Sequence, residues 1–170
     1  MNLPNLRRCE KLRVAGIIKN SVVNGIGIRD VLFLQGCRHR CEGCHNPETW
    51  DTNGGTVMLL EDLLCELSDS PNDITISGGE PLLQYEDLIV LLSGINNLSG
   101  KRFWLYTGFR YEEIPNDILK ELSKYVDVLV DGRFQEDKKD LTLQFRGSSN
   151  QRLIDLPMSI KENKIVLWEG

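Results

Sequence analysis

Short apolar runs alternate with amphipathic segments along most of the chain. Four of the runs have the length and composition of buried parallel strands, and they begin near residues 31, 73, 102 and 127. Segments with apolar residues at helical spacing precede the last three runs, over residues 57–67, 85–92 and 116–124. Such an alternation predicts a parallel sheet covered by helices.

The two ends of the chain depart from this rhythm. Residues 11–18 resemble a further strand, with a weaker one near residues 22–23, and two more strands are expected at residues 141–145 and 164–168. The whole chain has 170 residues, whereas a complete eight-unit barrel needs about 250. We therefore expect a single α/β domain over residues 1–170, built as an incomplete open parallel (β/α) barrel of about 5–6 strands.

Composition and charge exclude several classes of function. The hydrophobic fraction of 41% is enough for one core, and the net charge of −5 gives no broad basic surface for nucleic acid. The longest apolar runs fall far short of the roughly 20 residues that cross a bilayer. The first residues lack the charged and apolar regions of a secretion signal. We expect a cytoplasmic protein that binds neither nucleic acid nor membrane.

Polar or glycine-rich clusters directly follow all four predicted parallel strands. They lie in a long loop at residues 36–55 and in shorter segments at residues 77–80, 106–108 and 131–133. In parallel β/α folds, ligands bind where the carboxyl ends of the strands meet. The four clusters therefore predict one common site.

Three of the five cysteines fall in the first of these loops, as Cys37-x3-Cys41-x2-Cys44. Three close thiols in a cytosolic chain are more typical of a metal centre than of disulfides. A structural zinc ion completed by His39 or His45 is one interpretation. An iron–sulfur cluster with one iron open to a ligand fits three cysteines better, because structural zinc ligands usually come in two separated pairs. The remaining cysteines, Cys9 and Cys65, are isolated, and we interpret both as non-ligands.

Six segments carry a resemblance to a known family. They read LQGC at 34–37, CHNPETW at 44–50, SGGEPL at 77–82, LYTGF at 105–109, VLVDGRF at 128–134 and FRGSSNQR at 145–152. The cysteine spacing, followed by Gly-Gly-Glu after the next strand, is similar to that of radical S-adenosylmethionine enzymes. The later segments resemble the activating components of anaerobic ribonucleoside-triphosphate reductases. The resemblance covers about residues 12–156.

The resemblance implies a catalytic centre and two cofactors. Cys37, Cys41 and Cys44 would hold a [4Fe-4S] cluster whose open iron binds S-adenosylmethionine. One electron from the cluster would cleave the sulfonium bond and produce a 5′-deoxyadenosyl radical. That radical would abstract hydrogen from a glycine of the reductase. The chain would then be a glycyl-radical-generating oxidoreductase.

The resemblance also suggests cofactor contacts by position. Gly78, Gly79 and Glu80 would accept the methionine amino group, with Ser77 and Thr107 as weaker candidates. Asp131 and Arg133 would contact the ribose and the carboxylate. Many superfamily members place an aromatic residue before the last cysteine, next to the adenine. This chain has Gly43 there, so His45 or Asn46 is expected to substitute. The polar residues Ser148, Asn150, Gln151 and Arg152 would close over the cofactor, meet the partner or cap a strand.

Partners follow from the same family. We expect the large subunit of an anaerobic ribonucleoside-triphosphate reductase as target, and flavodoxin or ferredoxin as low-potential electron donor. A radical S-adenosylmethionine enzyme acting on another glycyl-radical enzyme or on a small metabolite is the alternative. A zinc-stabilised binding module is a third possibility, but it leaves the Gly-Gly-Glu segment unexplained.

Overall fold

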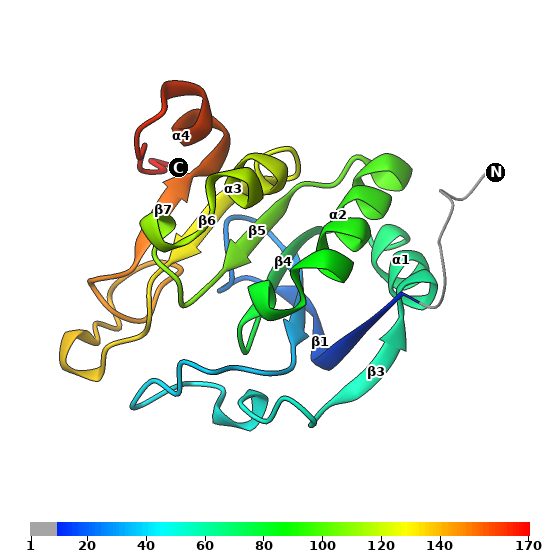
Figure 1. Ribbon diagram of the computed structural model, residues 1–170, viewed down its shortest axis with the longest axis horizontal. Helices are drawn as coiled ribbons and strands as arrows, with labels where there is room; N and C mark the ends of the chain where they lie inside the picture. The colour runs from blue at the N-terminus through cyan, green and yellow to red at the C-terminus, as the bar shows by residue number, and fades with distance from the viewer. Residues whose placement is uncertain (1–9) are drawn as a thin grey trace.

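The computed structural model describes residues 10–170, so Cys9 lies outside the described residues. Its centre is one seven-stranded sheet with the order β3-β1-β2-β4-β5-β6-β7 (Figure 1). The strands are β1 (Lys11–Ser21), β2 (Arg29–Leu34), β3 (Thr56–Leu59), β4 (Asp73–Gly78), β5 (Phe103–Tyr106), β6 (Val126–Asp131) and β7 (Arg152–Asp155). The α-helices are α1 (Leu60–Ser68), α2 (Tyr85–Ser99), α3 (Asn116–Leu122) and α4 (Leu156–Glu162). Four short 3-10 helices complete the fold: η1 (Pro47–Thr49), η2 (Pro81–Gln84), η3 (Tyr111–Glu113) and η4 (Glu136–Lys138).

The four strands expected to be parallel are parallel neighbours in the sheet. β2 pairs with β4, β4 with β5, and β5 with β6, each in the parallel sense. The flanking strands run the other way, because β1 pairs antiparallel with β2 and β3, and β7 pairs antiparallel with β6. The architecture is therefore a mixed α/β sheet of seven strands, and the expectation of about 5–6 strands was wrong.

Helices cover one face of the sheet and a smaller aromatic cluster covers the other. Phe103 and Leu105 of β5 are fully buried in the main core with leucines of α1, α2 and α3. Trp104, between them, points to the opposite face and packs with Phe145 and Trp168. This alternation is expected for a strand buried on both faces. Among the described residues, no helix has the length and apolar character needed to cross a membrane.

The segment expected as a helix over residues 57–67 is divided between two elements. Residues 56–59 pair antiparallel with β1, and α1 begins only at Leu60. The leucines at helical spacing, Leu60, Leu63, Leu64 and Leu67, are all buried as expected. The weak strand expected near residues 22–23 does not form, and Val22 and Val23 lie exposed in the connection between β1 and β2.

The C-terminal part also differs from expectation. Residues 141–145 form turns instead of a strand, because Asp140 accepts hydrogen bonds from the amide and hydroxyl of Thr142, and Phe145 has a left-handed φ of 60°. β7 and α4, which the sequence did not reveal, follow this loop. The last expected strand, at residues 164–168, is reduced to one antiparallel bridge between Ile154 and Leu167.

Candidate active site

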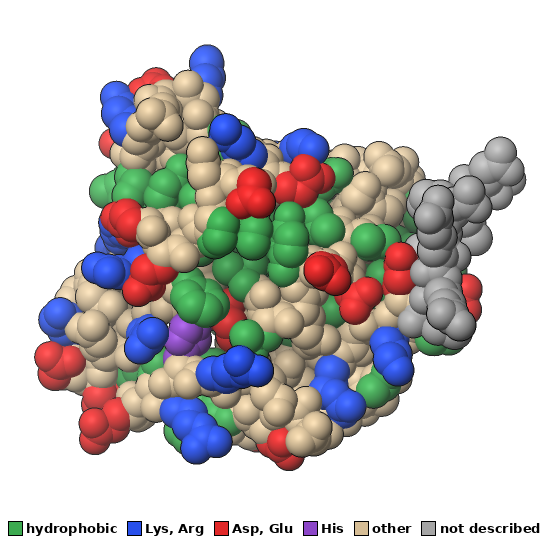
Figure 2. All heavy atoms as spheres, in the orientation of Figure 1, with side chains coloured by type: hydrophobic (Ala, Val, Ile, Leu, Met, Phe, Trp, Pro, Cys, Tyr) green, Lys and Arg blue, Asp and Glu red, His purple; other side chains and the backbone are tan. Residues whose placement is uncertain are grey.

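A cavity of about 310 Å³ lies at the carboxyl ends of the four parallel strands. This volume is at the lower end of the range typical for small-molecule sites, about 300–1,000 Å³. Ten residues expected at the site line it: Cys37, Cys41, Cys44, His45, Asn46, Ser77, Gly78, Gly79, Thr107 and Arg133. The four polar clusters that follow the strands do therefore meet. On the side of the molecule drawn in Figure 2, Lys and Arg side chains lie beside histidine.

The cysteine loop is closed at its base by hydrogen bonds. The amides of Gly36 and Cys37 donate to the carbonyls of Thr49 and Trp50, at 2.8 and 3.2 Å. The buried side chain of Gln35 donates to the carbonyls of Glu48 and Asp51, at 3.0 and 2.8 Å. A long loop thus becomes a compact unit that presents three thiols to the cavity.

The three thiols form a donor set suited to a cluster. Burial raises the pKa of Cys37 and of Cys41, and the charge of Cys44 raises both pKa values further. Three thiolates in one cavity thus favour a positively charged inorganic core as their common partner. A cubane cluster takes its thiolate ligands on separate irons, so three cysteines lining one cavity are a donor set that such a cluster accepts.

The two glycines of the Gly-Gly-Glu segment lie against the base of the cysteine loop. Gly78 has a φ of 109°, and a Cβ there would overlap the backbone of Leu34. A Cβ at Gly79 would overlap the backbone of Gly36. The amides of Gly79 and Glu80 donate to the carbonyls of Leu34 and Gly36, at 2.8 and 2.7 Å. Only glycine allows the two strand ends to approach this closely.

Glu80 does not line the cavity. Its carboxylate is 1% exposed and accepts four hydrogen bonds from protein groups. The donors are the amides of Leu82 and Gly108, the Thr107 hydroxyl and His39 Nε2, at distances of 2.8–3.0 Å. Glu80 therefore joins three strand ends, and its oxygens have protein partners where we expected a cofactor contact.

Asp131 is likewise buried and absent from the cavity wall. Its carboxylate binds the guanidinium of Arg152 and accepts a hydrogen bond of 2.7 Å from the amide of Tyr111. Arg133, two residues further, is exposed and reaches the cavity. Of the pair expected to contact ribose and carboxylate, the structure brings only Arg133 to the cavity.

The space beside Gly43, where a side chain would lie, is occupied by residues of the loop after β6. Gly43 has a φ of 69°, and a Cβ there would overlap the carboxylate of Glu136 and press on the ring of Phe134. Phe134 lines the cavity and packs against His45, with ring centroids 4.9 Å apart. The loop after β6 lies beside the cysteine loop (Figure 1), and its Phe134 brings an aromatic ring to the cavity. Sequence reasoning missed Phe134, and its place directly after Asp131-Gly132-Arg133 was the available signal.

Further residues complete the cavity wall. Gln151, from the polar run expected to close over the cofactor, meet the partner or cap a strand, lines the cavity, and so does Tyr106 of the expected segment 106–108. Gly147 and Trp50, which were not among the expected contacts, also contribute to the wall. Tyr106 donates from its hydroxyl to the carbonyl of Phe145 at 2.7 Å, and burial raises its pKa. Cys65 is exposed on α1 and does not line the cavity.

Comparison with known proteins first defines a class. Residues 23–154 match the family model described as a 4Fe-4S single cluster domain, which includes all three cavity cysteines. The fold is similar to that of the crystal structure of QueE from Escherichia coli, with a TM-score of 0.51 and 15% identity, over 88% of this chain and 67% of that one.

Curated relatives then define the family. The activating protein of enterobacteria phage T4 is 40% identical over 138 residues, covering 77% of this chain and 86% of its own length. Those of Salmonella typhi and Escherichia coli K12 are 39% and 38% identical over 139 residues, covering 76% of this chain and 90% of their own length. All three are named anaerobic ribonucleoside-triphosphate reductase-activating protein. The chain belongs to this family, so the resemblance seen in the sequence is confirmed.

Proposed function

We propose that this chain is a radical S-adenosylmethionine activase that generates a glycyl radical on the large subunit of anaerobic ribonucleoside-triphosphate reductase. The observation that carries the proposal is the meeting of three cysteines with the Gly78-Gly79 turn in one cavity at the strand ends. The names of the relatives supply the target. The 4Fe-4S description of the matched family supplies the cluster.

Different residues of the cavity hold the two cofactors. Cys37, Cys41 and Cys44 are the cluster ligands, and their loop is rigid because it is hydrogen-bonded at its base. When bound, the cluster would supply the electron that cleaves the sulfonium bond of S-adenosylmethionine, and the resulting radical chemistry would abstract hydrogen from a glycine. The protein binds, orients and shields these groups.

The methionine part of S-adenosylmethionine is assigned to the second strand end and its neighbours. Ser77, Gly78 and Gly79 line the cavity, and their main-chain carbonyls would receive the amino group. Arg133 is exposed at the cavity wall, where its guanidinium suits a carboxylate. In this proposal, Glu80 and Asp131 do not contact S-adenosylmethionine and instead position other residues. Glu80 fixes the Thr107-Gly108 turn, and Asp131 fixes the start of the segment that carries Arg133.

The adenine is assigned to the wall that contains Phe134. Its ring is half-buried and packs with His45, while Asn46 completes this side of the cavity. Aromatic rings stack readily on nucleobases, by about 1–3 kcal/mol per base. Phe134 therefore takes the place of the aromatic residue that Gly43 replaces in the cysteine loop.

An open sheet suits a protein-sized substrate. β3 and β7 lie at the two edges of the sheet, so the sheet does not close on itself. We expect such an open sheet for an incomplete barrel in a single domain. We propose that the glycine of the reductase enters the cavity from this open side. We also propose a cytoplasmic flavodoxin or ferredoxin as electron donor, because reduction of the cluster requires a low-potential partner.

An anaerobic reconstitution tests the function. The protein is loaded with iron and sulfide, reduced, and given S-adenosylmethionine. We expect about four irons per chain and formation of 5′-deoxyadenosine. Cys41→Ala should abolish the product, whereas Cys65→Ala, which removes an exposed thiol away from the cavity, should leave iron and product unchanged.

The reductase subunit completes the test. Its addition should consume S-adenosylmethionine and produce a glycyl-radical signal in electron paramagnetic resonance. Deoxyadenosine without that signal would direct attention to another glycyl-radical enzyme or a small metabolite. A colourless protein with one zinc and no deoxyadenosine would contradict the proposed function and favour a binding module.

A further inference from the structure

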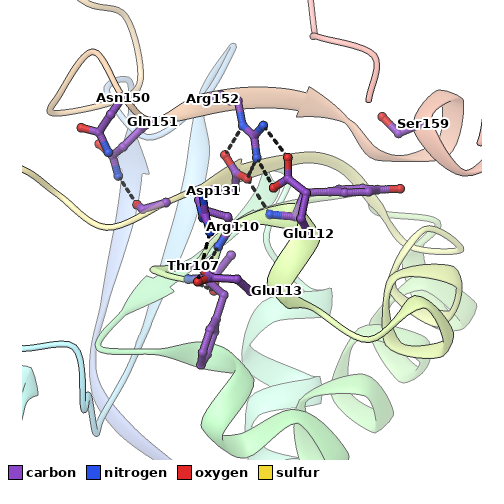
Figure 3. Close-up of polar contacts among 12 residues, drawn as sticks. Thr107, Arg110, Glu112, Glu113, Asp131, Asn150, Gln151, Arg152 and Ser159 are labelled. Carbon is purple, nitrogen blue, oxygen red and sulfur yellow. Dashed lines mark hydrogen bonds and ion pairs between the residues drawn. The ribbon is translucent and has the colours of Figure 1, made fainter. Parts of the chain in front are cut away.

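Three consecutive residues near the start of β7 hold the segment that follows β6 (Figure 3). Arg152 Nε donates to Asp131 Oδ1 at 3.0 Å. Gln151 Nε2 donates to the carbonyl of Gly132 at 3.0 Å, and Asn150 Nδ2 donates to the carbonyl of Arg133 at 2.8 Å. We call these three residues, Asn150, Gln151 and Arg152, the side-chain clamp.

The clamp extends the contact between β6 and β7 beyond the end of their main-chain pairing. The antiparallel ladder between β6 and β7 ends at the pair Asp131 and Arg152. In the same register, the next pairs are 132 with 151 and 133 with 150. Main-chain pairing stops there because Gly132 has a φ of 94° and its amide donates to the carbonyl of Phe109 at 3.0 Å. Side-chain amides take over the two missing contacts.

Gln151 also holds the opposite side of its own loop. Its Oε1 accepts from the amides of Gly147 and Ser148, at 3.0 and 3.2 Å. Gly132, Gly147 and Gln151 all line the cavity. One amide side chain therefore joins two pieces of cavity wall.

Arg152 anchors the clamp to the rest of the fold. Besides Asp131, its guanidinium makes a bidentate pair with Glu112 of η3, at 3.0 and 2.8 Å. Paired charges in such fork geometry are directional. The clamp is thus attached to η3, which follows β5, as well as to β6.

The segment that the clamp holds lies beside a cluster ligand. Gly132, Arg133 and Phe134 line the same cavity as Cys41, and Arg133 brings a positive charge to it. Groups that stabilise negative charge on a cysteine ligand also make an iron–sulfur cluster easier to reduce. The position of residues 132–134 therefore affects the reduction potential of the cluster as well as the shape of the cavity.

We propose that Asn150 and Gln151 are positioning residues that hold residues 132–134 against Cys41 and the cavity, and so set the reduction potential of the cluster and the affinity for S-adenosylmethionine. This inference deepens the proposed function and rests on it. Neither side chain needs to react. Each acts through the carbonyl that it binds.

Neutral substitutions of similar size test the inference. Gln151→Met and Asn150→Leu remove the amide donors without adding charge near the cluster. Asn96→Leu is the matched control, because Asn96 Nδ2 makes the same kind of bond, at 2.9 Å, to the carbonyl of Lys101 near the end of α2. The measurements are cluster content, midpoint potential by redox titration, and the dissociation constant for S-adenosylmethionine.

With full cluster content, we expect Gln151→Met to shift the potential to more negative values and to weaken S-adenosylmethionine binding about tenfold, because the variant loses three part-buried hydrogen bonds that hold the cavity wall. Asn150→Leu should shift both in the same direction by less, since its bond is exposed, and it remains informative if Gln151→Met does not fold. Asn96→Leu should change neither.

Wild-type potential and affinity in both cluster-loaded clamp variants would overturn the inference. An equal shift in Asn96→Leu would overturn it too, because the effect would then be one of general stability. If the wild-type protein itself held no [4Fe-4S] cluster, the proposed function would fail, which is a separate result.

Discussion

His39, between the first two cysteines of the cluster loop, binds Glu80 of the neighbouring strand end through its Nε2 at 2.8 Å from Oε2. The histidine is 8% exposed and the carboxylate 1%. The His39 ring also packs edge-on against Phe109, with centroids 4.7 Å apart. The two sequence segments that carry the resemblance to radical S-adenosylmethionine enzymes are thus joined by a direct contact between side chains.

The first prediction concerns Glu80. In Glu80→Gln, an amide group replaces one oxygen that accepts hydrogen bonds, so a buried donor loses its partner. We expect the free energy of unfolding to fall by about 2 kcal/mol and the cluster content to fall with it. Urea unfolding and iron analysis measure the two effects.

Glu66→Gln is the control for this substitution. Glu66 is an exposed member of an ion pair with Lys19, with 3.6 Å between Lys19 Nζ and Glu66 Oε1, so its replacement should change stability by less than about 0.5 kcal/mol. Equal losses in the two variants would show that the buried contacts of Glu80 are not what stabilises the strand ends.

The sequence predicted the central sheet because the four parallel strands carry their own signal. Ile74 and Ile76, for example, are buried in short apolar runs bounded by polar segments. β3 was missed because Thr56–Leu59 leads directly into the leucines of α1. Its pairing with β1, more than 40 residues earlier, has no local signature.

The C-terminal part of the chain was harder to predict, because the alternation of apolar and polar residues there indicated a strand that does not form. Leu141, Leu143 and Phe145 alternate with polar residues as in a strand, yet Leu141 is 86% exposed. The residues that do pair with β6 begin at Arg152, within a polar run whose role depends on partners about 20 residues away, such as Asp131.

The sequence predicted where the candidate site lies and which cysteines line it. It did not predict which polar residues face the cavity and which bind other protein groups. The cavity brings together Cys37, Cys41 and Cys44 with the Gly78-Gly79 turn. Spacing could not show that the carboxylates of Glu80 and Asp131 would be occupied by protein donors, because these contacts join residues far apart in the chain.

The second prediction concerns the close approach of two strand ends. A methyl group at position 79 would overlap the carbonyl of Gly36, which is backbone and cannot rotate away. We expect Gly79→Ala to reduce stability by about 3 kcal/mol, or to prevent folding, and to lower the cluster content. Gly16→Ala on β1, where no atom lies within 4 Å of the added Cβ, should be nearly neutral. Thermal unfolding of the two variants decides, and similar melting temperatures would contradict the prediction.

The third prediction concerns Phe134. If its ring stacks on the adenine, Phe134→Ala should weaken S-adenosylmethionine binding about tenfold, while the cluster stays in place. Phe145→Ala provides the comparison, because Phe145 packs on Trp104 and Trp168 and does not line the cavity. That variant should lose stability but retain cofactor affinity. Equilibrium binding to the reconstituted proteins tests both statements, and unchanged affinity in Phe134→Ala would assign the adenine to another wall.

The fourth prediction concerns stability in acid. The side chain of Asp30 is fully buried at the start of β2. Burial raises its pKa, but hydrogen bonds from Asn72, Ser70 and the amide of Asn20, together with Lys19, lower it to about 2 from an ordinary value of 3.8. Since the pKa is depressed in the folded state, the contribution to stability is present above pH 3.8 and disappears as the pH falls towards 2.

Asp30→Asn removes this dependence. At neutral pH the variant should be less stable than the wild type by about 2 kcal/mol, the amount that corresponds to such a shift. The difference should shrink steadily as unfolding is measured from pH 5 down to pH 3, in the same cofactor state for both proteins. Asp62→Asn, at an exposed position in the first turn of α1, should show no comparable convergence. A stability gap between wild type and Asp30→Asn that stayed constant over this range would show that the charge of Asp30 is not what its hydrogen bonds stabilise.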